Sequence, residues 1–159
     1  MDVSNSEQLD IVFRLVVAGG LGALIGLERE IRGYPAGIRT IALVAMGSCL
    51  FTDLSELFSG SESSRVAAQI VVGIGFLGAG VIIREGYSVR GITTSATIWA
   101  AAAIGMAAGL SLYIVAGLGS IFIFILLEAR PFTRRIDSTL PRLTNRFREP
   151  ETNDERHDD

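Results

Sequence analysis

The sequence ITTSATIWAAAAIGMAAGLSLYIVAGLGSIFIFILL, residues 92–127, contains no charged residue. A single helical crossing of the hydrocarbon core of a bilayer takes about 20 residues. The stretch is therefore too long for one span, and it divides naturally at the triplet Gly109-Leu110-Ser111. It predicts two consecutive transmembrane helices.

Three further apolar runs precede this stretch, at residues 9–27, 38–58 and 66–83. Of the 159 residues, 49% are hydrophobic and 19% are charged, whereas about 25% are charged in an ordinary soluble domain. Backbone groups that lie in lipid must be satisfied within helices. We therefore predict an all-α integral membrane protein, a bundle of about five transmembrane helices.

The arginines are concentrated on one side of this predicted membrane domain. They flank the first and third connections and follow the fifth span, as Arg29, Arg32, Arg39, Arg84, Arg90, Arg130, Arg134, Arg135, Arg142, Arg146, Arg148 and Arg156. Arg65 alone lies on the opposite side. Because cytoplasmic segments carry the excess of basic residues, we expect the N-terminus outside the cell and the C-terminus in the cytoplasm.

The chain is expected to have two parts. Residues 1–130 form the transmembrane domain, and residues 131–159 form a cytoplasmic tail that is first basic and then acidic. Residues 131–148 place apolar side chains at helical spacing among five arginines, which suits a short segment at an anionic lipid surface. Residues 149–159 are acidic and lack an apolar anchor, so we expect them to be disordered.

The stretch GIGFLGAG, residues 73–80, begins with the pattern G-x-G-x-x-G of a dinucleotide-binding loop. Such a loop follows a strand, opens a helix and has an acidic residue about 20 positions later. Ile98 occupies that place here, within another apolar run. We therefore reject a dinucleotide ligand, and nothing in the sequence points to a nucleic acid.

The same glycines fit a membrane helix that packs closely, because small residues let helix backbones approach each other. The predicted packing glycines are Gly22, Gly26, Gly73, Gly75, Gly78, Gly80, Gly105 and Gly109. Their faces serve either the bundle itself or the contact of a homo-oligomer. Since a leucine cannot fit where helices nearly touch, we expect the substitution Gly75→Leu to disrupt assembly.

Polar side chains inside the spans are costly and therefore mark functional or packing positions. Gln69 suits a hydrogen bond between helices. Thr93 and Thr94 open the fourth span, where hydroxyl groups cap a helix or bond back to its carbonyls. Trp99 suits either an interfacial anchor or packing inside the bundle.

One cation, Arg14, lies inside the first span. Its side chain either extends to the outer interface or pairs with Asp53 or Glu56 near the outer end of the second span. Cys49, the single cysteine, is interpreted as a small buried packing residue. The one histidine, His157, lies in the last three residues, and the sequence contains no catalytic constellation, so we do not expect an enzyme.

The two connections on the cytoplasmic side are dense in charge. The first holds Glu28, Arg29 and Arg39, and the third holds Arg84, Glu85 and Arg90. These residues form either ion pairs that lock the inner end of the bundle or a polar site for a cation, a phosphate group or a partner protein. The carboxylates of Glu28 and Glu85 suit Mg²⁺, although the neighbouring arginines would compete for them.

Three segments in this order resemble the MgtC/SapB family of bacterial membrane proteins. They are GLERE with AGIRT (residues 26–30 and 36–40), AAQIVVGIGFLGAGVIIREG (67–86) and VRGITTSATIWAAAAIGMAAG (89–109). The resemblance covers about residues 9–130. By position, the polar residues of the family's motifs are Glu28, Arg29, Arg39, Gln69, Arg84, Glu85, Arg90, Thr93, Thr94 and Trp99.

This resemblance implies a multi-pass protein of the cell inner (cytoplasmic) membrane that acts in magnesium homeostasis or adaptation to low Mg²⁺ and, in pathogens, in survival inside host cells. Regulation of a partner membrane protein is the implied mechanism, and a transporter or channel for Mg²⁺ or another ion is the alternative. The expected partners are the lipid bilayer and another membrane protein, a homo-oligomer, or both. No cofactor is implied beyond a possible Mg²⁺ ion. Longer members of the family add a cytoplasmic domain after the spans.

Overall fold

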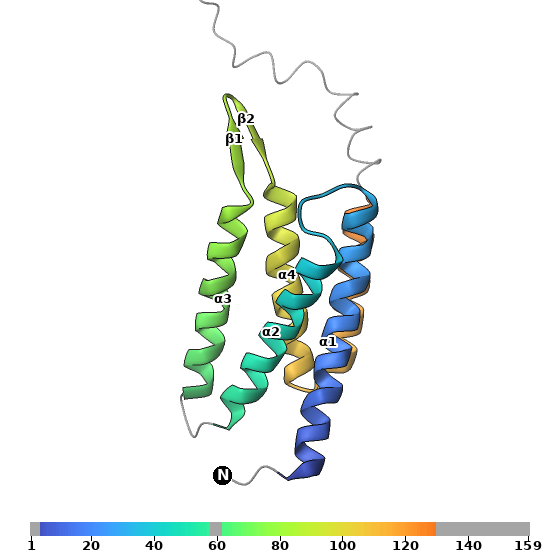
Figure 1. Cartoon of the computed structure of the whole chain (residues 1–159), viewed down its shortest axis with the longest axis vertical. Coiled ribbons are helices and arrows are strands. Elements are labelled where there is room, and N and C mark those ends of the chain that lie inside the picture. Colours follow the sequence, from blue (N-terminus) through green and yellow to red (C-terminus); the bar gives the residue numbers. More distant parts are fainter. Residues whose placement is uncertain (1–3, 58–61, 130–159) are drawn as a thin grey trace, which may run out of the picture. The chain divides into compact units, whose positions relative to one another are not determined.

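The computed structural model describes residues 4–57 and 62–129. The described elements are α1 (Asn5–Ile31), α2 (Ile38–Glu56), α3 (Glu62–Gly80), β1 (Ile83–Glu85), β2 (Ser88–Arg90), α4 (Ile92–Gly109) and α5 (Tyr113–Glu128) (Figure 1). By length and composition, α1 to α4 are able to cross a membrane, and α5 is a shorter apolar helix of 16 residues. The predicted all-α membrane fold is confirmed, and the predicted orientation stays a prediction.

The chain divides into two compact units, Met1–Ile125 and Leu126–Asp159. The first unit holds α1 to α4 and most of α5. The predicted tail, residues 131–159, lies outside the described residues, and so does the disorder expected for residues 149–159.

The division expected at Gly109-Leu110-Ser111 is confirmed, because α4 ends at Gly109 and α5 begins at Tyr113. The turn between them is closed by hydrogen bonds from the Ser111 amide to the Ala108 carbonyl and from the Leu112 amide to the Ala107 carbonyl. This is the Schellman pattern of a helix C-terminus. Ser111 takes the left-handed conformation, with φ of 60°, that the pattern requires.

The core lies where α1, α2 and α4 pack on one another through small residues. Its buried members include Ala18 on α1, Ala45 and Cys49 on α2, and Ala108 on α4. Because none of these side chains extends far from its helix axis, the three backbones approach closely, as small residues allow in membrane bundles. Cys49 is fully buried, as predicted for a packing residue.

Four of the predicted packing glycines lie at backbone contacts of this core. A Cβ atom added at Gly22 would lie 2.9 Å from the carbonyl oxygen of Ile41, and one at Gly26 would lie 2.6 Å from the Cα of Ile38. On α4, a Cβ at Gly105 would overlap the carbonyl oxygen of Ala45, and one at Gly109 would lie 2.8 Å from that of Cys49. These four glycines therefore lie where helix backbones approach each other.

The four predicted packing glycines of α3 differ in their surroundings within this chain. A Cβ atom at Gly78 would lie 2.6 Å from the Ser95 hydroxyl oxygen on α4. Cβ atoms at Gly73, Gly75 and Gly80 would meet nothing within 4 Å. The reason is that α3 presents only its Gly78 side to α4, so the other glycines face away from that neighbour.

The connection between α3 and α4 is a β-hairpin, which the sequence analysis did not foresee (Figure 1). The strands pair antiparallel, with Ile83 opposite Arg90 and Glu85 opposite Ser88. Gly86 opens the two-residue turn with φ of 61°, as tight hairpin turns require. Gly91 then starts α4 with φ of 90°, and a Cβ there would overlap the carbonyl oxygen of Val81.

Candidate functional site

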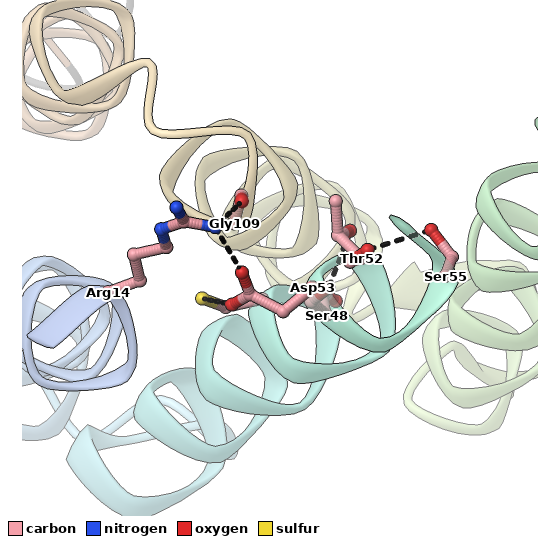
Figure 2. Close-up of polar contacts among 7 residues, drawn as sticks. Arg14, Ser48, Thr52, Asp53, Ser55 and Gly109 are labelled. Atoms are coloured by element: carbon pink, nitrogen blue, oxygen red, sulfur yellow. Dashed lines mark hydrogen bonds and ion pairs between the residues drawn. The ribbon is translucent and has the colours of Figure 1, made fainter. Parts of the chain in front are cut away.

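A buried ion pair joins α1 to α2 inside the bundle. The Nη1 atom of Arg14 lies 2.5 Å from the Oδ1 atom of Asp53 (Figure 2). The Asp53 side chain is 1% exposed and that of Arg14 is 26% exposed. Of the two alternatives for Arg14, pairing with Asp53 is therefore the one that the structure adopts.

Two further groups form hydrogen bonds with this pair. The same Nη1 atom of Arg14 donates a hydrogen bond to the carbonyl oxygen of Gly109, at 3.1 Å. The Cys49 thiol donates to Oδ2 of Asp53, at 3.5 Å. We call Arg14, Cys49, Asp53 and Gly109 the Arg14–Asp53 cluster. It ties α1, α2 and the C-terminal end of α4 together at one point (Figure 2).

The local sequence explains why this cluster forms. Cys49 and Asp53 are four residues apart on α2, so they lie on the same helix face. Gly109 has no side chain, so the end of α4 lies against Cys49 and Thr52. This close approach brings a carbonyl oxygen at the helix end, where backbone acceptors lack partners within the helix, within reach of Arg14.

The burial of the Arg14–Asp53 ion pair makes it important for the stability of the fold. In an apolar interior the attraction between opposite charges is strong, but each charge left alone there costs several kcal/mol. An ionisable pair inside a membrane bundle is also the usual mark of a functional position. The Arg14–Asp53 cluster therefore holds three helices together, and it is also the strongest candidate site within the described residues.

Hydroxyl groups near the cluster mostly bond back to their own helix. Thr52 Oγ1 donates to the carbonyl oxygen of Ser48 at 2.8 Å, and Ser55 Oγ donates to that of Thr52 at 2.7 Å (Figure 2). Such bonds let a hydroxyl lie in an apolar interior without a partner on another helix. Ser48 differs, because its Oγ atom is buried and has no hydrogen-bond partner within the described part of the chain.

A second buried charge cluster lies at the C-terminal end of α1. Oε1 of Glu28 is 2.7 Å from Nε of Arg32, and Oε2 of Glu28 is 3.7 Å from Nη1 of Arg29. The Glu28 and Arg29 side chains are 4% and 1% exposed. The Arg29 guanidinium lies 3.5 Å from the centre of the Tyr34 ring, which is a favourable cation–π contact. We call Glu28, Arg29, Arg32 and Tyr34 the Glu28 cluster.

The carboxylate of Glu30 fixes the turn that follows this cluster, a role that the sequence analysis missed. Its Oε2 atom accepts a hydrogen bond from the Ile38 amide, at 2.8 Å, at the first turn of α2. The N-cap residue Gly37 offers no side-chain cap of its own, and a Cβ there would lie 2.5 Å from Oε2 of Glu30. The sequence contains one indication of this role: Gly37, which precedes α2, has no side chain that could cap the helix.

The predicted charges of the third connection lie on the exposed hairpin. Arg84 donates from Nε to the carbonyl oxygen of Gly86, at 3.1 Å. Glu85 and Arg90 pair at 3.8 Å, with side chains that are 60% and 74% exposed. In the first connection, Arg39 is exposed as well. The ion pairs described at these connections therefore join neighbours within one connection, and whether the two connections face a common ligand is still a prediction.

The polar residues predicted inside the spans divide between the core and the surface. Thr94 is 2% exposed, whereas Thr93 is exposed and its carbonyl accepts a bond from Thr97 Oγ1 at 2.8 Å. The expected bonding of a hydroxyl back to its helix is thus observed at Thr97. Gln69 is exposed, and Trp99 is 53% exposed, so Trp99 does not pack inside the described bundle.

The chain resembles proteins of one family along most of its length. The model of the MgtC family matches residues 15–136. The Protein MgtC of Brucella abortus (strain 2308) is 53% identical over 104 residues, which are 65% of this chain and 44% of that protein. The Protein MgtC of Salmonella typhimurium (strain LT2) is 54% identical over 99 residues, 62% of this chain and 43% of that protein.

The matched stretch thus spans less than half of the length of these curated relatives. No solved structure matches the chain. Among residues 4–57 and 62–129, no group of three or more His, Cys, Asp or Glu side chains is placed to hold a metal ion.

Proposed function

Because the chain belongs to the MgtC family, we propose that it is a non-enzymatic, multi-pass protein of the cytoplasmic membrane that acts in magnesium homeostasis or adaptation to low Mg²⁺ by regulating another membrane protein. Its N-terminus lies outside and its C-terminus in the cytoplasm in this proposal, as the distribution of arginines favours. The magnesium role rests on what the family resemblance implies, and the mechanism rests on the surface of α3.

The observation that carries the mechanism is a set of small residues on α3 that no other described part of the chain covers. Gly75 and Ala79 are four residues apart and exposed, and a Cβ at Gly75 would meet nothing within 4 Å. Small residues at this spacing typically lie where two membrane helices touch. The adjacent Phe76, 82% exposed, supplies an aromatic side chain beside them. This face suits a helix of a partner protein.

The packing of the other helices supports regulation by contact over transport. The backbones of α2 and α4 meet at Gly105 and Gly109, and those of α1 and α2 meet at Gly22 and Gly26. A hydrated ion needs a path lined with polar groups, and these contacts leave little room for one among α1, α2 and α4. A transport path would therefore have to be formed with another chain.

One observation favours the alternative, a transporter for Mg²⁺ or another ion. Asp53 is an acidic residue almost completely buried inside the bundle, and ionisable residues at such places often belong to ion or proton pathways. Here its charge is matched by Arg14 at 2.5 Å. An ion using Asp53 would have to displace that arginine first.

The test combines crosslinking with growth at low Mg²⁺. A photo-crosslinking amino acid at position 76 should capture another membrane protein in cells that require the chain for growth. The substitution Gly75→Leu should abolish both the capture and the growth. Gly20→Leu is the matched control, because a Cβ at Gly20 on α1 also meets nothing within 4 Å, and it should preserve both.

Two results would contradict regulation of a partner. One is capture of copies of this chain alone, which would make the face of α3 a homo-oligomer contact. The other is saturable Mg²⁺ uptake into proteoliposomes that contain only the purified chain, lost in Asp53→Asn. The second result would establish the transporter.

A further inference from the structure

A groove runs between α2 and α3, away from the Arg14–Asp53 cluster. Its volume is about 820 Å³, within the range of about 300–1,000 Å³ that is usual for sites of small ligands. The α2 wall includes Leu43, Gly47, Ser48 and Phe51, and the α3 wall includes Arg65, Gln69, Gly73 and Leu77.

The groove is polar at one end and apolar at the other. Arg65 and Gln69 are four residues apart near the beginning of α3, so they lie on one face of the helix. Gly73 and Leu77 continue the same row one and two turns further. Arg65 is the one charged residue among the described residues that line the groove. A cation beside the end of a membrane helix lies at the depth of lipid headgroups.

A buried group in the wall lacks a hydrogen-bond partner among residues 4–57 and 62–129. Ser48 is 2% exposed, it lines the groove, and its Oγ atom makes no hydrogen bond. A buried hydroxyl without a partner is destabilising, and the neighbouring Thr52 and Ser55 avoid that cost by bonding to their own helix. The Ser48 hydroxyl is therefore available to a ligand atom that accepts a hydrogen bond.

From these observations we infer that the groove between α2 and α3 binds one anionic glycerophospholipid. Arg65 holds the phosphate, because basic side chains between membrane helices recognise lipid headgroups in this way. Gln69 and Ser48 donate to the ester oxygens of the glycerol region. An acyl chain lies along Gly73 and Leu77, where the missing side chain of Gly73 leaves space. Such a site exists equally in a regulator and in a transporter.

The amphiphilic order of the groove favours a lipid over a protein helix. A membrane helix presents apolar side chains along its whole length, and it would leave the Ser48 hydroxyl unpaired unless a polar residue happened to lie opposite. A phospholipid carries its anion, its ester oxygens and its hydrocarbon in the same sequence as Arg65, Ser48 and Gly73 along the groove.

The experiment is native mass spectrometry of the full chain in detergent micelles. Dioleoyl phosphatidylglycerol, which is anionic, and dioleoyl phosphatidylcholine, which is zwitterionic, are titrated separately. The wild-type chain should bind one phosphatidylglycerol more tightly than phosphatidylcholine. Arg65→Gln should remove that preference, because the headgroup charge then has no cation opposite it.

Filling the groove gives the decisive comparison. Gly73→Leu should raise the Kd for phosphatidylglycerol about tenfold or more, because the leucine side chain occupies the space of the acyl chain. Gly75→Leu is the matched control on the same helix, since Gly75 does not line the groove, and its affinity should equal that of the wild type. Both leucines have open space at their Cβ atoms, so both variants should fold, as thermal unfolding will verify.

Two outcomes would overturn the lipid site. The first is unchanged phosphatidylglycerol binding in Gly73→Leu, which would place any bound lipid elsewhere. The second is equal affinity of the wild-type chain for phosphatidylglycerol and phosphatidylcholine, which would show that Arg65 does not hold the phosphate. If Gly73→Leu loses a dimer while its lipid binding is unchanged, a helix of a second copy fills the groove instead.

Discussion

Arg14 and Asp53 show at the scale of single residues how a polar pair is tolerated inside a membrane bundle. Asp53 is almost completely enclosed, whereas Arg14 keeps about a quarter of its side chain exposed. The two partners are therefore not equivalent. If Asp53 is removed, Arg14 can extend toward the interface, but if Arg14 is removed, the carboxylate stays buried without its counter-charge.

We predict that Arg14→Met destabilises the fold more than Asp53→Leu. Leaving a buried charge without its partner typically costs about 3–5 kcal/mol, and this should apply to Arg14→Met. The double variant Arg14→Met/Asp53→Leu should be more stable than Arg14→Met alone, since it removes the isolated charge. Denaturant unfolding of the four proteins in a mild detergent measures this as a double-mutant cycle. Strictly additive losses would show that the pair contributes nothing.

Gly91 gives a second prediction for a single residue. Its φ of 90° and the overlap of an added Cβ with the Val81 carbonyl both oppose a side chain. Gly86 has a similar φ of 61°, but a Cβ there would meet open space. We expect Gly86→Ala to lose about 1–2 kcal/mol from backbone strain alone and Gly91→Ala to lose clearly more. Equal losses in thermal unfolding would mean that the backbone at Gly91 shifts to admit the methyl group.

The sequence was sufficient to predict some of these residues and not others. Gly22 and Gly105 were found because small residues recur at helical spacing, and that pattern needs no knowledge of the neighbour. For Gly73 and Gly80 the same pattern did not show which neighbour they face, since a helix with small residues does not reveal which side its own chain covers. Asp53 was identified only as one of two possible partners of Arg14, because helix rotation decides between them.

At the scale of elements, the helices were easier to predict than their connections. The apolar runs define α1 to α5 to within a few residues because lipid requires continuous helices. The hairpin of β1 and β2 was not predicted, because its strands have only three residues each and contain Arg84, Glu85 and Arg90. Its signal was weak, because Gly86 permits a tight turn but the two apolar residues Ile82 and Ile83 followed by the charged Arg84 and Glu85 show no strand alternation.

Glu30 links the end of α1 to the start of α2, because its carboxylate accepts a hydrogen bond from the Ile38 amide. Glu30→Ala should destabilise the fold by about 1 kcal/mol, the usual contribution of a helix cap, since the Ile38 amide then loses its acceptor. Glu30→Gln keeps an oxygen acceptor at the same distance and should be close to the wild type. Hydrogen exchange at the first turn of α2 checks both variants. Equal protection in Glu30→Ala and the wild type would refute the capping role.

At the scale of the whole molecule, the glycines separate contacts inside the chain from contacts that the chain can make with others. Gly105 lies where the backbones of α2 and α4 meet, and Gly75 lies where α3 has no neighbour within 4 Å. A leucine is therefore expected to act in opposite ways at the two positions. At Gly105 it changes folding, and at Gly75 it changes only what binds to the surface of α3.

We accordingly predict that Gly105→Leu prevents stable folding, because overpacking at a backbone contact forces the helices apart and typically costs about 1–3 kcal/mol or more. Gly75→Leu should unfold at the wild-type temperature in detergent, or slightly above it because leucine favours helix over glycine. In cells, however, Gly75→Leu should lose the crosslinked partner, since a leucine fills the face that the partner helix approaches. Thermal unfolding and crosslinking measure the two effects separately. A Gly75→Leu protein that is stable and still captures its partner through position 76 would show that the partner helix does not need the space at Gly75, and the small residues of α3 would then not form the contact.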